Sequence, residues 1–89
     1  MKGMGKHIIL GIHVTDRVRH AGEVQRLLSE YGCCIKTRLG LHETSRNFCS
    51  PNALILIEMR DDLACKNALK RKLAKVKGIE VKEMVFGHP

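Results

Sequence analysis

The sequence has no tryptophan and only three other aromatic residues, Tyr31, Phe48 and Phe86. A protein that stacks single-stranded bases on its surface needs more aromatic side chains than this. The chain also has no apolar run close to the roughly 20 residues that span a bilayer. Its first residues, MKGMGKHIILGIHV, contain no small-residue cleavage site. We therefore expect a cytoplasmic protein without a signal peptide and without a membrane partner.

The four cysteines lack the C-x-x-C spacing that is typical of zinc ribbons and thioredoxin-like motifs. In the cytoplasm we expect all four, Cys33, Cys34, Cys49 and Cys65, to be reduced. Cys33 and Cys34 are neighbours in a predicted strand and should point to opposite faces, which argues against a shared metal. Cys65 lies on the apolar stripe of a predicted helix and should pack in the core.

The 89 residues allow one domain, and 44% of them are hydrophobic. We place the domain at residues 6–86, after a flexible N-terminus at 1–5 and before a C-terminal tail at 87–89. A chain this short buries only roughly 60–65% of its unfolded surface. Association with further copies is therefore a natural way to bury more apolar surface.

Alternating apolar residues predict strands at 6–14, 33–42, 53–59 and 79–86, and stripes of helical period predict helices at 16–31 and 62–77. Thr15 or Asp16 should cap the first helix and Asp61 the second, while Gly32 and Gly78 should end them. Residues 43–52 are expected to be loop. The order β-α-β-β-α-β indicates an α+β, ferredoxin-like sandwich with both helices on one face of a four-stranded antiparallel sheet.

The two central strands of this sandwich would be 6–14 and 53–59, the most apolar segments of the chain. On the face away from the helices, Ile9, Leu54 and Leu56 would have no cover. An exposed apolar patch of this kind is typical of an interface. We therefore expect a homodimer or a homotetramer that forms through the open sheet face.

Several segments resemble a known family. DRVRHAGEVQRLLSEYG, IKTRLGLHE, CSPNALILIEM and KGIEVKEMVF are similar to segments of small ACT-like proteins named as iron-only hydrogenase system regulators. The resemblance runs from about His7 to Phe86. It implies an ACT-like fold, an oligomer and a regulatory role, either in transcription or in a hydrogenase system. The hydrogenase link comes from the family's name alone.

No catalytic constellation is present, and we expect a protein that is not an enzyme and has no cofactor. The segment VTDRVRH, after the first strand, has neither the cysteines of a metallochaperone nor the glycines of an acylphosphatase-like anion cradle. The sequence also contains neither G-x-x-x-x-G-K nor G-x-S-x-G. A Cys–His nucleophile pair would lack an orienting third group.

The segment from 42 to 51 holds the strongest candidates for a site. His42 and Cys49 fall where the more distantly similar ligand-binding domain of nickel-responsive repressors has its His and Cys ligands. Imidazole and thiolate suit nickel, zinc or copper. Two ligands are too few for a site within one subunit, so we expect a mobile connection without metal. The alternative is a transition-metal site that His13 or Cys34 of a neighbouring subunit completes.

For a small regulatory ligand, the sequence indicates Arg38, Gly40, His42 and Asn52, because loops held by a rigid sheet often carry binding groups. His20 is expected to be a partly buried structural residue. The formal charge of +7 raises nucleic acid as an alternative partner. The residues expected to form its basic surface are Lys66, Lys70, Arg71 and Lys75, helped by Arg19, Arg26, Lys2 and Lys6.

Overall fold

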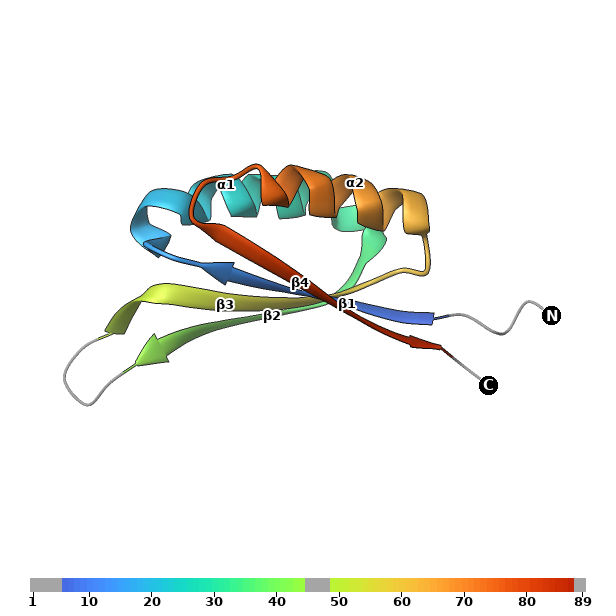
Figure 1. The fold of residues 1–89 in the computed structure, drawn as a ribbon, viewed down its shortest axis with the longest axis horizontal. Helices are drawn as coiled ribbons and strands as arrows, with labels where there is room; N and C mark the ends of the chain where they lie inside the picture. The colour runs from blue at the N-terminus through green and yellow to red at the C-terminus, as the bar shows by residue number, and fades with distance from the viewer. Residues whose placement is uncertain (1–5, 45–48, 88–89) are drawn as a thin grey trace.

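The computed structural model describes residues 6–44 and 49–87, with side-chain placement for all of these except 17, 18 and 41–51. Two helices cover one face of a four-stranded antiparallel sheet (Figure 1). The elements in chain order are β1 (Lys6–Val14), α1 (Arg17–Glu30), a short 3-10 helix η1 (Gly32–Cys34), β2 (Ile35–Thr44), β3 (Cys49–Met59), α2 (Leu63–Ala74) and β4 (Ile79–Gly87). The predicted ferredoxin-like order is therefore confirmed.

The strand order is β2-β3-β1-β4, so β1 and β3 are central, as expected. β1 pairs with β3 from Ile8 opposite Met59 to Val14 opposite Ala53, and with β4 along its whole length. Side chains alternate between the two faces of a strand. The even-numbered positions of β1 therefore face the helices, and the odd-numbered positions lie on the open face.

The core fills the space between the helices and the sheet. Among the side chains that the structure describes, it contains twelve buried apolar ones: Ile8, Leu10, Ile12, Val14, Val24, Leu27, Leu28, Ile55, Ile57, Met59, Leu69 and Leu73. Each fully buried side chain of this size contributes about 1.5–3 kcal/mol of transfer free energy. The predicted stripe of α1 is confirmed, since Val24, Leu27 and Leu28 are buried and Tyr31 packs against them.

The helix ends differ from the sequence-based expectation. α2 begins after Asp62 rather than Asp61, and the Asp62 carboxylate accepts a hydrogen bond from the Cys65 backbone N at 3.1 Å. Asp16 occupies the N-cap position of α1, as one of the two expected residues, but its φ is +52° and its side chain makes no capping hydrogen bond. α1 ends at Glu30, and Gly32 belongs to η1 with no positive φ, so Gly32 does not terminate the helix as expected.

The strands around the β2–β3 connection also differ from the prediction. Cys33 and Cys34 lie in η1, and β2 starts only at Ile35, after which a bulge shifts its register before Thr37. β2 continues to Thr44, and β3 begins at Cys49, where Thr44 pairs with Cys49. Most of the expected loop at 43–52 is therefore strand, and the β2–β3 hairpin projects past the helices (Figure 1). Residues 45–48, 1–5 and 88–89 lie outside the described part of the chain.

Gly78 joins the helical layer to the sheet in the turn before β4. Its φ is +81°, and its carbonyl oxygen accepts hydrogen bonds from both the N and the Oγ1 of Thr15, at 2.9 and 2.8 Å. A Cβ at this position would lie 2.6 Å from His20 Cδ2. The partly buried His20 thus packs over a backbone position that only glycine fits. α2 has already ended at Ala74, so Gly78 shapes the turn instead of terminating the helix.

Within residues 6–44 and 49–87, neither helix is long and apolar enough to cross a membrane.

Candidate functional site

The sheet face away from the helices is apolar at its centre. Ile9 of β1 lies between Met84 of β4 and the β3 strand, and Leu56 of β3 lies opposite both Gly11 and Leu39. Several large apolar side chains are exposed on this face: Leu39, Leu54, Met84 and Phe86. We call the apolar side chains on this face the open-face patch. They are Ile9, Leu39, Leu54, Leu56, Met84 and Phe86. Leu54 is exposed, as expected, whereas Ile9 and Leu56 lie on the same face but are half-buried.

Two shallow hollows lie within the open-face patch. One, of about 230 Å³, is lined by Ile9, Leu39 and Leu56 together with Thr37 and Glu58. The other, of about 130 Å³, lies between Ile9, Leu56 and Met84. Side chains from an opposing surface can pack into these two hollows.

One end of the open face carries charge. His7 Nδ1 donates to Glu58 Oε2 at 2.8 Å, and Lys36 Nζ lies 3.6 Å from the same oxygen. The hydrogen bond from His7, with a smaller contribution from Lys36, lowers the pKa of the Glu58 carboxyl below its ordinary value. The open face therefore combines an apolar centre with a charged cluster at its edge.

The residues indicated for a small ligand lie on β2 and β3. Arg38 is paired with Ile57 on the helix side of the sheet, and its guanidinium donates a hydrogen bond to Gln25 Oε1 of α1. Gly40, opposite Ile55, is exposed, and a Cβ there would meet nothing within 4 Å. The Asn52 Oδ1 accepts from the Asp16 backbone N at 3.4 Å. Arg38 and Gly40 therefore lie on the helix side of β2, while Asn52 of β3 is joined to Asp16 at the start of α1.

The side chains of His42 and Cys49 lie outside the described residues, so the metal-site prediction remains a prediction. The backbone register pairs His42 with Ala53 and Cys49 with Thr44, so the two are not direct cross-strand partners. His13, the expected helper from a neighbouring subunit, lies opposite Leu54 on the open face. Among the side chains that the structure places, no group of three or more His, Cys, Asp or Glu is arranged to hold a metal ion.

The predicted basic surface of α2 requires a correction. Lys66 is buried, with 7% of its surface exposed, and its Nζ lies 2.8 Å from Glu83 Oε2 of β4. Lys70 Nζ lies 2.5 Å from the other oxygen of the same carboxylate. Lys66 is therefore buried, Lys70 is half-exposed, and Arg71 and Lys75 are exposed. A nucleic-acid surface on α2 would lack Lys66, and Lys70 would have to leave its pairing with Glu83.

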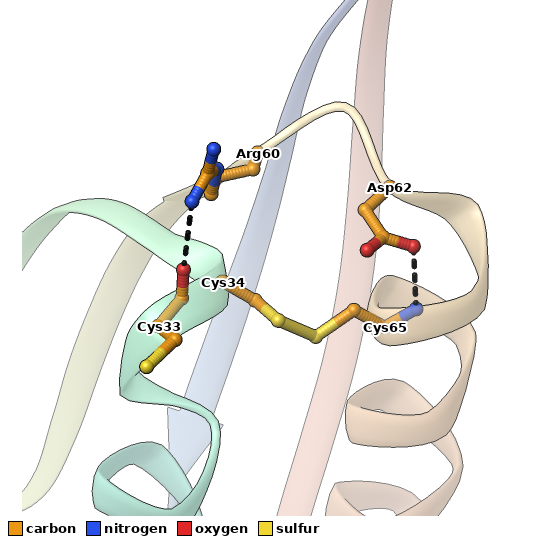
Figure 2. Close-up of a disulfide and its surroundings, with 5 residues drawn as sticks. All are labelled: Cys33, Cys34, Arg60, Asp62 and Cys65. Carbon is orange, nitrogen blue, oxygen red and sulfur yellow. Dashed lines mark hydrogen bonds between the residues drawn. A yellow bond between two sulfur atoms is a disulfide. The ribbon is translucent and has the colours of Figure 1, made fainter.

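The cysteines require a second correction. Cys34 and Cys65 form a disulfide, with their Cα atoms 6.6 Å apart, instead of two separate thiols. Figure 2 shows the bond joining η1 to the first turn of α2. η1 makes this contact feasible, because it turns Cys34 out of the strand geometry that the sequence predicts. Cys33 is a free, exposed cysteine.

An open hollow lies beside this disulfide. Its lining consists of Cys33, Cys34, Arg60, Asp61, Asp62 and Leu63. Arg60 makes two hydrogen bonds to η1. Its backbone N donates to the Cys34 carbonyl at 2.8 Å. Its Nη1 donates to the Cys33 carbonyl at 3.5 Å, as Figure 2 shows. Sequence reasoning missed this site, because no spacing in the chain indicates that residues 34 and 65 meet.

Comparisons with known proteins agree with this architecture. Residues 6–83 match the family model described as "TM1266-like: Iron-only hydrogenase system regulator, putative". No curated protein matches the sequence. The solved structure of the uncharacterized protein TM1266 from Thermotoga maritima is 30% identical, covers 90% of this chain and 96% of its own, and superposes with a TM-score of 0.76.

Two more distant structures share the fold. The ACT domain from GTP pyrophosphokinase of Chlorobium tepidum is 17% identical, with a TM-score of 0.61, over 91% of this chain and 99% of that domain. A dimeric ferredoxin-like protein from an uncultured marine organism is 10% identical, with a TM-score of 0.58, over 94% of this chain and 95% of its own. The chain therefore belongs to the TM1266-like family and has an ACT-like, ferredoxin-like fold.

Proposed function

We propose that the protein is a non-catalytic regulatory subunit that pairs with a second copy through the open-face patch and senses a small ligand. The observation that carries the proposal is the apolar face itself, which the two helices leave uncovered (Figure 1). Family membership supports a regulatory role, and the similarity to an ACT domain supports a sensing fold. The hydrogenase system in the family's name is a candidate for what is regulated.

A second copy suits this face on physical grounds. A two-fold interface brings the same patch together from both subunits and must be complementary to itself. The open face meets this requirement in two ways. Apolar side chains and hollows alternate at its centre, and its charged end offers both a carboxylate, on Glu58, and a cation, on Lys36.

The ligand site in this proposal lies on the β2–β3 hairpin, at Arg38, Gly40, His42 and Asn52. Arg38 is exposed, and its guanidinium suits a carboxylate or a phosphate group. The exposed Gly40 leaves space next to it. A ligand that binds one arrangement of the dimer more tightly shifts the population toward that arrangement. The protein would then signal through a partner protein that distinguishes the arrangements.

A thermal-shift screen with amino acids, nucleotides and divalent metals tests ligand sensing. A ligand at about 100 times its dissociation constant adds ~2.7 kcal/mol of stability, which corresponds to a rise in melting temperature of roughly 11–22 °C for a chain of this size. Arg38→Ala should abolish the response to an anionic ligand. Arg71→Ala, which removes an exposed arginine from α2, is the matched control and should leave the response unchanged. A flat response across the panel would contradict the proposal.

A further inference from the structure

We propose that the Cys34–Cys65 disulfide is a reversible thiol–disulfide switch, opened by a dithiol reductant at the hollow beside η1. Small dithiols and dithiol proteins are the chemical class of reactant that this site would take. The proposal does not depend on dimer formation or on a regulatory ligand. It rests on the placement, access and surroundings of the two sulfurs.

Access comes from the hollow. Cys34 is one of its lining residues, whereas Cys65 is not, and the neighbouring Cys33 and Leu63 are exposed. A reductant that enters the hollow therefore reaches Cys34, and both cysteines of the bond are only partly buried. Disulfides that stabilise a fold usually resist reduction, whereas exposed disulfides are the labile and regulatory ones.

The fold does not depend on the bond for its core. Cys34 and Cys65 pack against the cluster of twelve buried side chains from outside and are not members of it. Within the described residues, the strand pairings of the sheet involve neither Cys34 nor Cys65. A folded reduced state is therefore available, which a switch requires.

The exchange is balanced in two steps. A thiolate of the reductant attacks the Cys34 sulfur, a mixed disulfide forms there, and the Cys65 sulfur leaves with the bonding electron pair. The second thiol of the reductant then displaces the Cys34 sulfur. The reductant ends as a disulfide and the protein gains two thiols, with the two protons supplied by the reductant's thiols.

Opening the bond changes how the edge strand is held. The disulfide ties η1, just before β2, directly to the first turn of α2. Without it, η1 is held in this region by the two hydrogen bonds from Arg60, which belongs to the connection between β3 and α2. The switch would therefore loosen the start of β2, where the bulge between Ile35 and Thr37 already interrupts the pairing.

The Cys33→Ser/Cys49→Ser double variant tests the proposal, because it keeps Cys34 and Cys65 as the only cysteines. The variant is equilibrated with dithiothreitol and oxidised glutathione, and thiols are counted by alkylation and mass spectrometry. We expect no alkylated cysteine under oxidising conditions and two under reducing conditions. The two thiols should appear together in a single transition, and reoxidation should remove both. Glutathione trapped in the mixed disulfide should lie on Cys34.

Hydrogen exchange of the wild-type protein gives a second readout. In the reduced state, the Arg60 amide that donates to Cys34 should lose protection, while amides of β1 keep theirs. Two results would overturn the proposal: two alkylated cysteines under all conditions, or loss of the cooperative thermal transition on reduction. The first would show that no bond forms, and the second that the bond is purely structural.

Discussion

The Nζ of Lys66 lies 2.8 Å from Oε2 of Glu83, so a charge pair joins α2 to β4 at the edge of the core. Among the residues that the structure describes, Lys66 is the one charged residue that is buried, with 7% of its surface exposed. Lys70 approaches the other carboxylate oxygen from the next turn of α2. One carboxylate thus neutralises two cations that would otherwise face the sheet unpaired.

Replacing Glu83 by Gln should lower the free energy of unfolding by about 1.5–3 kcal/mol, the usual value of a hydrogen bond to a charged group. The loss arises because the Lys66 ammonium stays buried without a counter-charge. Urea denaturation measures it. Glu80→Gln on the same strand is the matched control. Its partner Lys82 is exposed and 3.7 Å away, so the loss should be below about 1 kcal/mol. Equal losses in the two variants would contradict this account.

The same pair predicts how stability depends on pH. Hydrogen bonds from Lys66 and then Lys70 hold the pKa of the Glu83 carboxyl below its ordinary value of 4.5. A carboxyl whose pKa is lower in the folded state adds stability above its unfolded pKa and loses it as the pH falls through the folded pKa. The stability difference between the wild type and Glu83→Gln should therefore be complete at neutral pH and shrink below pH 4.5. A stability difference between the two proteins that grows as the pH falls would contradict this account.

The placement of Lys66 shows where sequence reasoning fails. Residues 66, 69, 70 and 73 lie at helical spacing on one face of α2, and Leu69 and Leu73 identify that face as the buried one. The spacing alone would have placed Lys66 inside. Its charge led to the opposite prediction, because buried lysines are rare. The partner that makes burial tolerable, Glu83, is 17 residues away on another strand.

Gly78→Ala should destabilise the protein by more than about 1–2 kcal/mol, which is the cost of a left-handed conformation for a residue with a Cβ. The close approach of His20 Cδ2 adds a steric cost. Gly22→Ala, inside α1, is the matched control. A Cβ at Gly22 meets nothing within 4 Å, so this variant should gain about 0.5–1 kcal/mol from helix propensity. Thermal denaturation separates the two, and equal effects would contradict the assignment of Gly78.

Replacing Cys34 and Cys65 together by Ala should lower the free energy of unfolding by about 3–4.7 kcal/mol. The bond closes a sequence separation of 31 residues, and chain-entropy estimates for loops of 15 and 100 residues bracket it. Cys33→Ala should change stability little, because Cys33 is exposed. The measurement is denaturation without reductant. A double variant as stable as the wild type would show that the disulfide does not form in solution.

The regular elements could be predicted because each depends on local periodicity. β1 at Lys6–Val14 has the expected bounds, and the βαββαβ order follows from alternation, helical stripes and turn residues. The β2–β3 hairpin was predicted too short, because Ser50, Pro51 and Asn52 are typical of loops yet lie within β3. The Cys34–Cys65 contact could not be predicted, since it depends on η1 and on the tertiary position of α2.

Light scattering of the purified protein, with and without the Met84→Glu substitution, tests the proposed interface most directly. Met84 lies on the open-face patch and is 51% exposed in the single chain, so the substitution should leave the fold intact. We expect a dimer or tetramer of the 10.0 kDa chain for the wild type and a monomer for Met84→Glu. Leu63→Glu, equally exposed at 51% but outside the patch, is the control and should remain associated. A wild-type monomer at micromolar concentration, or association that survives Met84→Glu, would contradict the account.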